Sequence, residues 1–366
     1  MLDVDSFEKM DAMMQFAKKS GAPFGGIQVV LVGDFFQLPP VKSKKFLFDS
    51  ILFWHTCDEF WELKEVFRQT DSIFTQLLHR IRTGDHTADD MECLQTRLLK
   101  NLVASPSSHC IEGIIPTKLY AKNMNVDAVN ESQFNLLTSP ISTFLPKNGY
   151  FSSKTCTSKQ LELVTKAQEK LSKDINLPES LNLRIGSQVM LAFNLDVAGG
   201  LCNGSRGVIT DFKVPTTPFR DVFHRQFSED EKKKGLAVRV LYPTIPLPIV
   251  QFDNGRKVFI PYARWSRKLD GLAEVYTWHI PLRFAWATTI HRCQGTSLSS
   301  VQATLDASVF EVGQAYVALS RARSLEGLIL NSLDPSVIRV NQKVKEFYAQ
   351  PFQLQRTLRI TESASL

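Results

Sequence analysis

A stretch of short apolar runs separated by glycines, between Leu183 and Tyr262, most constrains the fold of this 366-residue chain. The runs are too short for helices and the glycines provide turns, so the stretch predicts β-strands. Further strands are expected at residues 236–242, 249–252 and 258–262, with a hairpin turn at 253–255 and an exposed charged loop at 229–234. Helical and strand patterns alternate on both sides of this region. The sequence therefore predicts an α/β body with an all-β insertion.

The flanking parts contain several predicted helices. A first helix, capped by Asp5 or Ser6, is expected to end before Gly21, and a second is expected between Asp71 and Gly84. A third is expected at residues 311–323, and a last one opens at residues 334–335. The polar stretch 152–173 predicts a surface loop with partial helix.

Short apolar runs in the same parts predict strands. The β-branched run at residues 27–32 predicts a buried strand, and further strands are expected at 301–305 and 328–330. The run at 27–32 leads directly into a polar cluster at 33–41, and ligands in open α/β sheets bind at the carboxyl ends of strands. This cluster is therefore a candidate functional site.

Composition excludes several classes of protein. Hydrophobic residues make up 43% and charged residues 22%, and neither a membrane-length apolar run nor a signal-peptide pattern occurs, so a soluble, intracellular protein is expected. The six cysteines are too widely spaced for a zinc site or a disulfide framework, so no metal site is expected. The net charge is +6, and residues 255–300 contain seven basic and two acidic side chains. That window is either a solvated basic face or a surface that binds a polyanion.

Clusters of Gln, Arg and Asp could carry phosphoryl-transfer chemistry. They lie at residues 33–41, 66–69 and 314–323, and a fourth cluster at 285–295 adds an aromatic side chain, hydroxyl groups and an imidazole. Arginines spread positive charge over a transferring phosphate, while an amide can orient water. The alternative from spacing alone is that these arginines are ordinary surface residues.

Taken together and in order, seven blocks resemble the Pif-type (RecD-like) superfamily 1 DNA helicases. The blocks are Met1–Phe7, Pro23–Gln28, Gly33–Val41, Phe67–Gln69, Gly200–Gly207, Ile290–Gly295 and Ala315–Arg323. The resemblance implies RecA-like P-loop NTPase lobes, the first incomplete, with an inserted SH3-like β module. It implies a first-lobe remnant at 1–62, a second lobe at 63–205 and 280–350, the β module at 206–279 and a tail at 351–366.

The resemblance also implies roles for individual residues. Gln37 matches the glutamine that senses the γ-phosphate, with Asp34 supporting its loop, and Arg68 matches the arginine of the next motif. Arg321, rather than Arg323, matches the arginine finger, since residues two apart on a helix point to opposite sides. Gln294 and Gly295 match the motif that couples nucleotide to DNA. Weaker candidates for DNA contact are Asn203, Thr289 and His291. The basic window adds Arg267 and Lys268 to these candidates.

The implied activity is that of an ATP-dependent 5′ to 3′ helicase that moves on single-stranded DNA and unwinds duplex in DNA repair, recombination and telomere maintenance. The expected partners are single-stranded DNA and duplex junctions, the expected state is a monomer, and the expected location is the nucleus or mitochondrion if the source is eukaryotic. The alternatives are a non-catalytic remnant that binds single-stranded DNA and a helicase fragment from a mobile element.

One departure from the family limits this expectation. The phosphate-binding pattern G-x-x-x-x-G-K-[ST] is absent, and the family's magnesium-binding Asp-Glu pair would precede the opening Met-Leu-Asp. The ligands of ATP and Mg²⁺ are therefore expected in a preceding portion, and this chain alone is expected to be inactive. A magnesium site at residues 29–34 was the other possibility, but the sequence that follows fits the γ-phosphate motif better. Met1 is thus expected to be internal to a longer helicase, through a truncated gene model, a fragment or a decayed copy.

Overall fold

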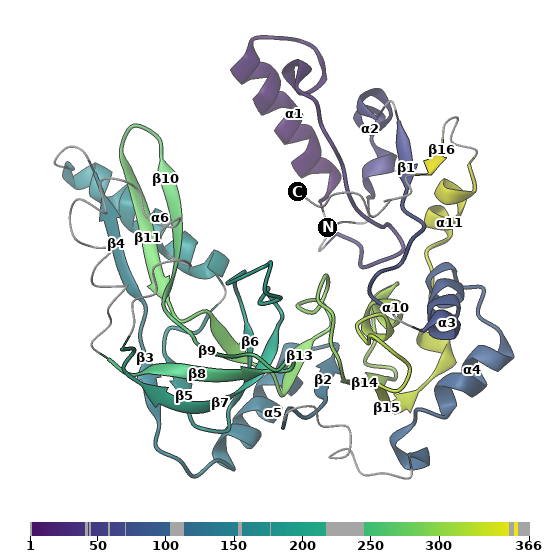
Figure 1. Ribbon diagram of the computed structural model, residues 1–366. Helices are drawn as coiled ribbons and strands as arrows, with labels where there is room; N and C mark the ends of the chain where they lie inside the picture. Colours follow the sequence, from purple (N-terminus) through teal and green to yellow (C-terminus); the bar gives the residue numbers. More distant parts are fainter. Residues whose placement is uncertain are drawn as a thin grey trace.

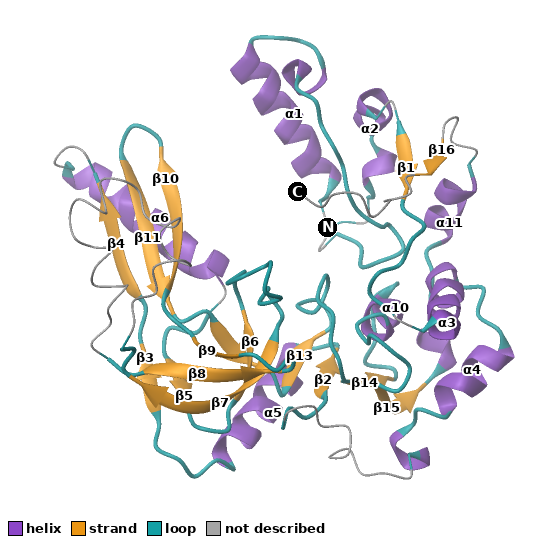
Figure 2. Cartoon of the chain, in the orientation of Figure 1, coloured by secondary structure: helices purple, strands orange, loops and turns teal. Residues whose placement is uncertain are grey.

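The computed structural model describes residues 2–40, 43, 45–57, 59–69, 71–102, 113–152, 156–175, 177–216, 245–350 and 355–357 (Figure 1). They form a parallel-sheet body, a β-rich part, and an N-terminal part that packs with the last helix (Figure 2). The strand expected at 236–242 and the loop expected at 229–234 lie outside the described residues. No helix in these ranges is both long enough and apolar enough to cross a membrane.

The parallel-sheet body contains four strands in the order β13-β2-β14-β15, and all neighbouring pairs are parallel. The strands are β2 (Thr117–Tyr120), β13 (Ala287–Thr289), β14 (Val301–Leu305) and β15 (Leu328–Leu333). The helices are α3 (Ser72–Thr83), α4 (Ala88–Gln95), α5 (Asn123–Asn135) and α10 (Gln314–Leu319), with a 3-10 turn η3 (Leu99–Asn101). The strands expected at 301–305 and 328–330 are confirmed. The helix expected at 311–323 is shorter, because Gly313 precedes it in the left-handed region with φ 75°.

Helix α3 follows from its local sequence. Asp71 accepts a hydrogen bond from the Ile73 amide at 2.9 Å, and Gly84 ends the helix with φ 76°. Its apolar face lies in the body's core, where four side chains are almost fully buried: Phe74, Leu77, Leu78 and Ile81. The predicted bounds of this helix are confirmed.

The β-rich part contains an antiparallel five-stranded sheet in the order β12-β6-β7-β8-β9. The strands are β6 (Gln188–Leu191), β7 (Arg206–Lys213), β8 (Leu247–Phe252), β9 (Lys257–Phe259) and β12 (Leu282–Phe284). The predicted turn at 253–255 joins β8 to β9, with Gly255 at φ 81°. Since β6 and β12 flank residues 206–279, the sheet extends beyond that range, and an SH3-like module there stays a prediction.

A second group of strands lies beside helix α6 (Ser158–Ile175). These are β10 (Ala263–Leu269), β11 (Ala273–His279) and β4 (Lys147–Phe151), with β3 (Ser142–Phe144) and β5 (Leu181–Leu183) paired separately. The stretch 152–173, expected to be a surface loop with partial helix, does contain a helix, but the helix is longer than expected and takes up residues 158–173. Val164, Ala167 and Leu171 recur at helical spacing and are buried with Val275 of β11, so an apolar stripe on an otherwise polar sequence determined the structure.

The N-terminal part joins the two ends of the chain. It contains α1 (Val4–Lys18), η1 (Pro23–Gly26), η2 (Leu47–Asp49), α2 (Ile51–Thr56) and β1 (Phe60–Glu62). It packs with α11 (Gln342–Ala349), and β1 pairs in parallel with β16 (Gln355–Thr357) (Figure 1). The short helix η5 (Pro335–Val337) precedes α11 and buries Val337 in the core of the parallel-sheet body. The packing is aromatic: the ring of Phe35 lies 5.0 Å from Phe48 and 5.2 Å from Phe347 of α11.

Three predictions in this part are wrong. The cap of α1 is Asp3, whose carboxylate accepts from the Ser6 amide at 2.7 Å, rather than Asp5 or Ser6. Asp334 caps only η5, and α11 begins after Asn341. Residues 27–32 form no strand, and Val32 is 90% exposed. A strand needs neighbours to satisfy its backbone groups, and no described strand pairs with this run.

Candidate functional site

The loop that carries Asp34 and Gln37 is held by the aspartate. The Phe36 amide donates to Asp34 Oδ1 at 3.1 Å, and the Gln37 amide donates to the Asp34 carbonyl oxygen at 3.1 Å. The same carboxylate accepts hydrogen bonds from Arg82 at 2.9 and 2.8 Å. Gln294 Nε2 donates to Gln37 Oε1 at 3.2 Å. Gln37 thus connects its own loop, in the N-terminal part, to the loop that follows β13.

Helix α10 begins directly against this loop. A Cβ on Gly313 would lie 2.6 Å from the carbonyl oxygen of Phe36 and 2.8 Å from that of Gln37. Gln314 is fully buried, and its Oε1 accepts from the amides of Phe310 and Glu311 at 3.1 and 3.2 Å. Glycine at 313 therefore permits a close approach that no side chain would allow.

Arg321 lies just after α10 and is buried in the protein interior. Its side chain is 1% exposed. The guanidinium donates to the carbonyl oxygens of Val317 and Thr296 at 2.8 and 2.9 Å and to Ser320 Oγ at 2.7 Å. These bonds fix its position, whereas Arg323 is exposed.

Arg68 lies near Arg321, although more than 250 residues separate them in sequence. It is half-buried and donates through Nε to Ser297 Oγ at 2.9 Å. Burial, followed by the positive charge of Arg68, lowers the pKa of Arg321 to about 10. Burial also lowers the pKa of Arg68. The two arginines contact the adjacent residues Ser297 and Thr296, and no carboxylate of the described residues is paired to either, so they are a candidate anion-binding pair.

Two neighbouring residues were not singled out from sequence. Tyr316 is largely buried, which raises its pKa, and Asp34, Arg82, Arg321 and Arg68 all act electrostatically on its hydroxyl. Tyr316 lies inside the Ala315–Arg323 block, so that block was a sequence signal that could have identified it. Arg82 carried no local signal, because its partner Asp34 lies on another part of the fold.

The loop after β13 brings further predicted residues close to this group. Gln294 contacts Gln37, and Gly295 has φ 86° with open space where a Cβ would lie. The turn of Asn203 packs onto the same loop, because a Cβ on Gly204 would lie 2.6 Å from Thr296 Cγ2. Asn203 itself is exposed.

Thr289 and His291 are less available than expected for contact with DNA. Thr289 is 4% exposed, and its Oγ1 accepts from the Arg292 amide at 3.3 Å. The imidazole of His291 stacks on Phe310 with ring centroids 6.2 Å apart, and burial lowers its pKa. His291 is therefore predominantly neutral near pH 7 and offers a ring face more than a charge.

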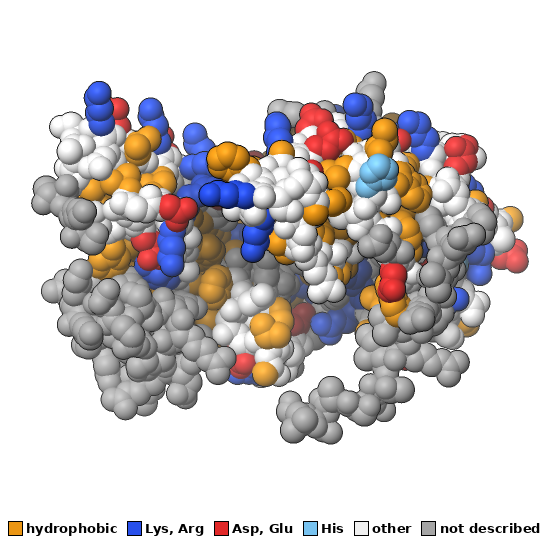
Figure 3. All heavy atoms as spheres, turned by 90° about the horizontal axis from the view of Figure 1, so that it is seen from above, with side chains coloured by type: hydrophobic (Ala, Val, Ile, Leu, Met, Phe, Trp, Pro, Cys, Tyr) orange, Lys and Arg blue, Asp and Glu red, His pale blue; other side chains and the backbone are white. Residues whose placement is uncertain are grey.

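Arg267 and Lys268 lie on β10, far from α10 in Figure 1. Arg267 forms an ion pair with Asp174 of α6 at 3.2 Å, while Lys268 is exposed. Two other cations of the basic window are also paired, as Arg256 contacts Asp196 at 2.9 Å and Arg264 contacts Glu274 at 3.2 Å. Seen from above in Figure 3, the molecule presents Lys and Arg side chains scattered over the visible face with Asp and Glu side chains among them.

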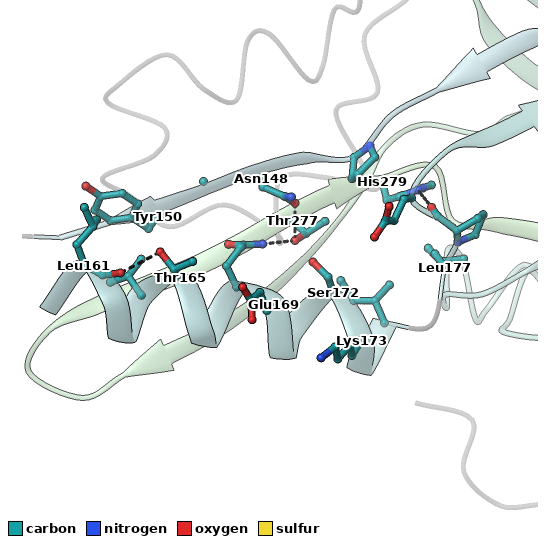
Figure 4. A pocket seen from close by; sticks show the side chains of 17 residues that line it. Asn148, Tyr150, Leu161, Thr165, Glu169, Ser172, Lys173, Leu177, Thr277 and His279 are labelled. Carbon is teal, nitrogen blue, oxygen red and sulfur yellow. Dashed lines mark hydrogen bonds between the residues drawn. The ribbon is translucent and has the colours of Figure 1, made fainter. Parts of the chain in front are cut away.

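A separate cavity of about 880 Å³ lies between α6 and the strands β4 and β11 (Figure 4). Gln168 Nε2 donates to Thr277 Oγ1 at 2.7 Å, and Thr277 Oγ1 donates to Asn148 Oδ1 at 2.9 Å, so these three side chains form a short hydrogen-bonded chain across it. None of the residues predicted from sequence lines it.

Comparison with known proteins identifies the family. The model of the PIF1-like helicase matches residues 1–92, and that of the DNA helicase Pif1 2B domain matches residues 169–212. The ATP-dependent DNA helicase PIF1 of Danio rerio is 36% identical over 95% of this chain and 47% of its own length. The Pif1 helicase structure from Candida albicans is 31% identical, with a TM-score of 0.66 over 95% of this chain and 74% of that one. The chain belongs to the Pif1 helicase family.

Other relatives agree on the fold of this Pif1-family chain. The structure of Bacteroides sp Pif1 in complex with ADP-AlF4 is 24% identical, with a TM-score of 0.67 over 95% of this chain and 72% of that one, which supports the RecA-like helicase fold. The Xenopus laevis PIF1 helicase is 36% identical over 99% of this chain and 49% of its own length. This chain therefore spans about half the length of these two curated relatives.

Proposed function

We propose that this chain is the motor portion of an ATP-dependent 5′ to 3′ DNA helicase that moves on single-stranded DNA. Gln37, Arg68 and Arg321 contact the γ-phosphate, and Gln294 and Gly295 couple the nucleotide to DNA. The parent activity serves DNA repair, recombination and telomere maintenance. Family membership supports this proposal, together with relatives whose names specify an ATP-dependent DNA helicase.

The observation that carries the proposal is the arginine pair beside Gln37. Arg68 and Arg321 come from distant segments, lie close together and have no carboxylate partner among the described residues. Two adjacent cations repel each other, and the carbonyl and hydroxyl oxygens that accept their hydrogen bonds carry no net charge, so a bound anion would stabilise the pair further. The γ-phosphate of ATP is such an anion, and arginine is well suited to stabilise its charge during transfer.

The described residues fit the phosphates of ATP better than they fit Mg²⁺. Among them, no group of three or more His, Cys, Asp or Glu side chains could hold a metal ion, and Asp34 is engaged by Arg82. ATP supplies the phosphoryl group when it is bound. The role of this chain's residues is to bind and orient that group: the arginines neutralise its charge, and Gln37 presents an amide to it.

Nucleotide binding tests the proposal. Isothermal titration calorimetry of ATP into the 366-residue chain, with and without oligothymidine, should detect weak binding. Arg68→Ala should weaken it tenfold or more, whereas Arg323→Ala, which removes an exposed arginine from the block that contains Arg321, should leave it unchanged. Equal effects of the two substitutions, or no binding at millimolar ATP, would contradict the assigned site. No ATP hydrolysis is expected, because the phosphate-binding pattern is absent from these residues.

A second candidate is a non-catalytic remnant that binds single-stranded DNA, which the same missing pattern favours. It predicts DNA binding without any nucleotide binding, so the calorimetry separates it from the first candidate. A helicase fragment from a mobile element is a third possibility, which shares every one of the sequence blocks with the first. In each case we propose single-stranded DNA and duplex junctions as partners, a monomeric chain, and the nucleus or mitochondrion as location in a eukaryote. Related structures of Bacteroides Pif1 bound to ssDNA and of Pif1 helicases at forked dsDNA support this choice of partners.

A further inference from the structure

Arg82 connects two parts of the molecule that are otherwise separate in the sequence. It lies in the last turn of α3, whose apolar face is buried in the parallel-sheet body. Its Nε and Nη2 donate to the two carboxylate oxygens of Asp34, in the N-terminal part, at 2.9 and 2.8 Å. The side chains are 21% and 17% exposed, so solvent screens this pair only partly. A two-bond contact of this kind fixes orientation as well as distance.

Aromatic rings hold the guanidinium in place. Its central carbon lies 4.7 Å from the ring centre of Phe36 and 5.6 Å from that of Tyr348 on α11. The two rings stack 4.8 Å apart, and the Tyr348 hydroxyl accepts from the Phe35 amide at 3.2 Å. A planar guanidinium suits both rings and carboxylate, whereas a lysine ammonium would provide neither the fork nor the stacking.

The carboxylate that Arg82 binds is also the one that shapes the Gln37 loop. Asp34 accepts from the Phe36 amide, and Gln37 Nε2 approaches its other oxygen at 3.5 Å. Gln37 in turn accepts from Gln294. Moving Asp34 would therefore move the Gln37 amide relative to Arg68 and Arg321.

We infer that Arg82 is a positioning residue, which locks the Gln37 loop onto the parallel-sheet body and so sets the Gln37 amide for the γ-phosphate. It acts through Asp34 and does not itself touch the nucleotide. The phosphate-directed part of this inference rests on the proposed function, while the locking of the loop does not.

The chain contains a matched control for Arg82. Arg80, two residues earlier on α3, also forms a two-bond ion pair, with Asp90 at 2.8 and 2.6 Å, but this pair lies wholly within the parallel-sheet body. Arg82→Ala and Arg80→Ala therefore each remove one Arg–Asp pair from one helix. Only the first removes a link between the two parts.

Amide hydrogen exchange and ATP calorimetry of the full chain test the inference. Arg82→Ala should raise exchange at residues 34–38 at least tenfold and weaken ATP binding several-fold, while exchange at 74–81 stays unchanged. Arg80→Ala should change exchange at 87–90 and leave 34–38 and ATP affinity as they are. Arg82→Lys should restore only part of the protection, and Asp34→Asn should reproduce the loss if Arg82→Ala fails to fold.

Unchanged exchange at 34–38 in both Arg82→Ala and Asp34→Asn would overturn the inference. If the unmodified chain binds no ATP, the proposed function fails, but the exchange result still decides whether Arg82 locks the loop. If exchange rises at 34–38 while measurable ATP affinity stays unchanged, the locking holds and the positioning role is refuted.

Discussion

Asp90 shows how one buried carboxylate makes stability depend on pH. It is 3% exposed and accepts from Arg80 and from the Thr87 amide at 2.9 Å. The hydrogen bonds of Arg80 hold its pKa at about 2, against an ordinary value of 3.8. A lowered pKa means that the stabilisation is complete above about pH 4 and is lost as the pH falls toward 2.

We expect Asp90→Asn to lower the free energy of unfolding at pH 6 by about 1 kcal/mol, a figure reduced for the partial exposure of Arg80. The deficit relative to the unmodified chain should shrink between pH 4 and pH 2. Urea unfolding at several pH values measures it. Asp89→Asn, at the exposed neighbouring residue, is the control. An equal loss of unfolding free energy in this variant would contradict the stabilising role assigned to Asp90.

Arg206 is a second residue whose burial carries a prediction. It is 1% exposed, and burial lowers its pKa to about 10. From β7 it donates to Thr117 Oγ1 at 2.8 Å and to the Ser300 carbonyl oxygen at 2.9 Å; Thr117 is the first residue of β2 and Ser300 directly precedes β14. It also donates to Ser299 Oγ at 2.6 Å. These bonds tie the five-stranded sheet to the parallel-sheet body.

Arg206→Met should therefore destabilise the chain by roughly 3 kcal/mol, because several buried acceptors lose their donor. Urea unfolding should also lose cooperativity, since the two parts would separate. Lys257→Met on β9, which removes an exposed cation, should change stability by less than about 0.5 kcal/mol. A similar small effect of Arg206→Met would show that this link does not contribute.

At the scale of elements, α3 depends on how it ends. Gly84 has φ 76°, and a Cβ there would lie 2.9 Å from Val340 Cγ2. Gly84→Ala should thus cost about 1–2 kcal/mol, from the left-handed conformation and the close contact together. Gly21→Ala serves as control, because Gly21 has open space around it. Thermal unfolding compares the two, and equal midpoints would refute the expected strain.

For the whole molecule, the basic window at residues 255–300, together with the proposed function, predicts binding of single-stranded DNA that weakens with salt. The pairing of Arg267 with Asp174 leaves Lys268 as the more available cation on β10. The double variant Arg267→Glu with Lys268→Glu should bind DNA more weakly. It should also make the plot of log affinity against log salt concentration less steep by roughly 1, because each phosphate contact to single-stranded DNA contributes about 0.7 to the steepness. Fluorescence anisotropy with oligothymidine measures this.

Lys100→Glu on η3, which removes an exposed cation from another part of the molecule, provides the control. If it lowers the salt slope as much as the β10 substitutions do, the effect reflects net charge, and β10 is not a DNA-binding surface.

Local sequence determined the features that depend on neighbouring residues. The cap and stop of α3, strand β14 and the turn before β9 follow from backbone conformation and short-range hydrogen bonds, so they could be predicted. The sequence blocks also identified the family, because seven short patterns in one order are specific even when each is weak.

Tertiary structure decided what depends on distant partners. The run at 27–32 has strand composition but no described neighbour to pair with, so it forms no strand and leaves most of its apolar side chains exposed. The contact of Arg82 with Asp34 and the burial of Arg321 beside Arg68 join segments that no local pattern relates. Charge and residue type are written in the sequence, but which charges meet is a property of the folded chain, since an ion pair forms only where the packing of other elements brings its two groups together.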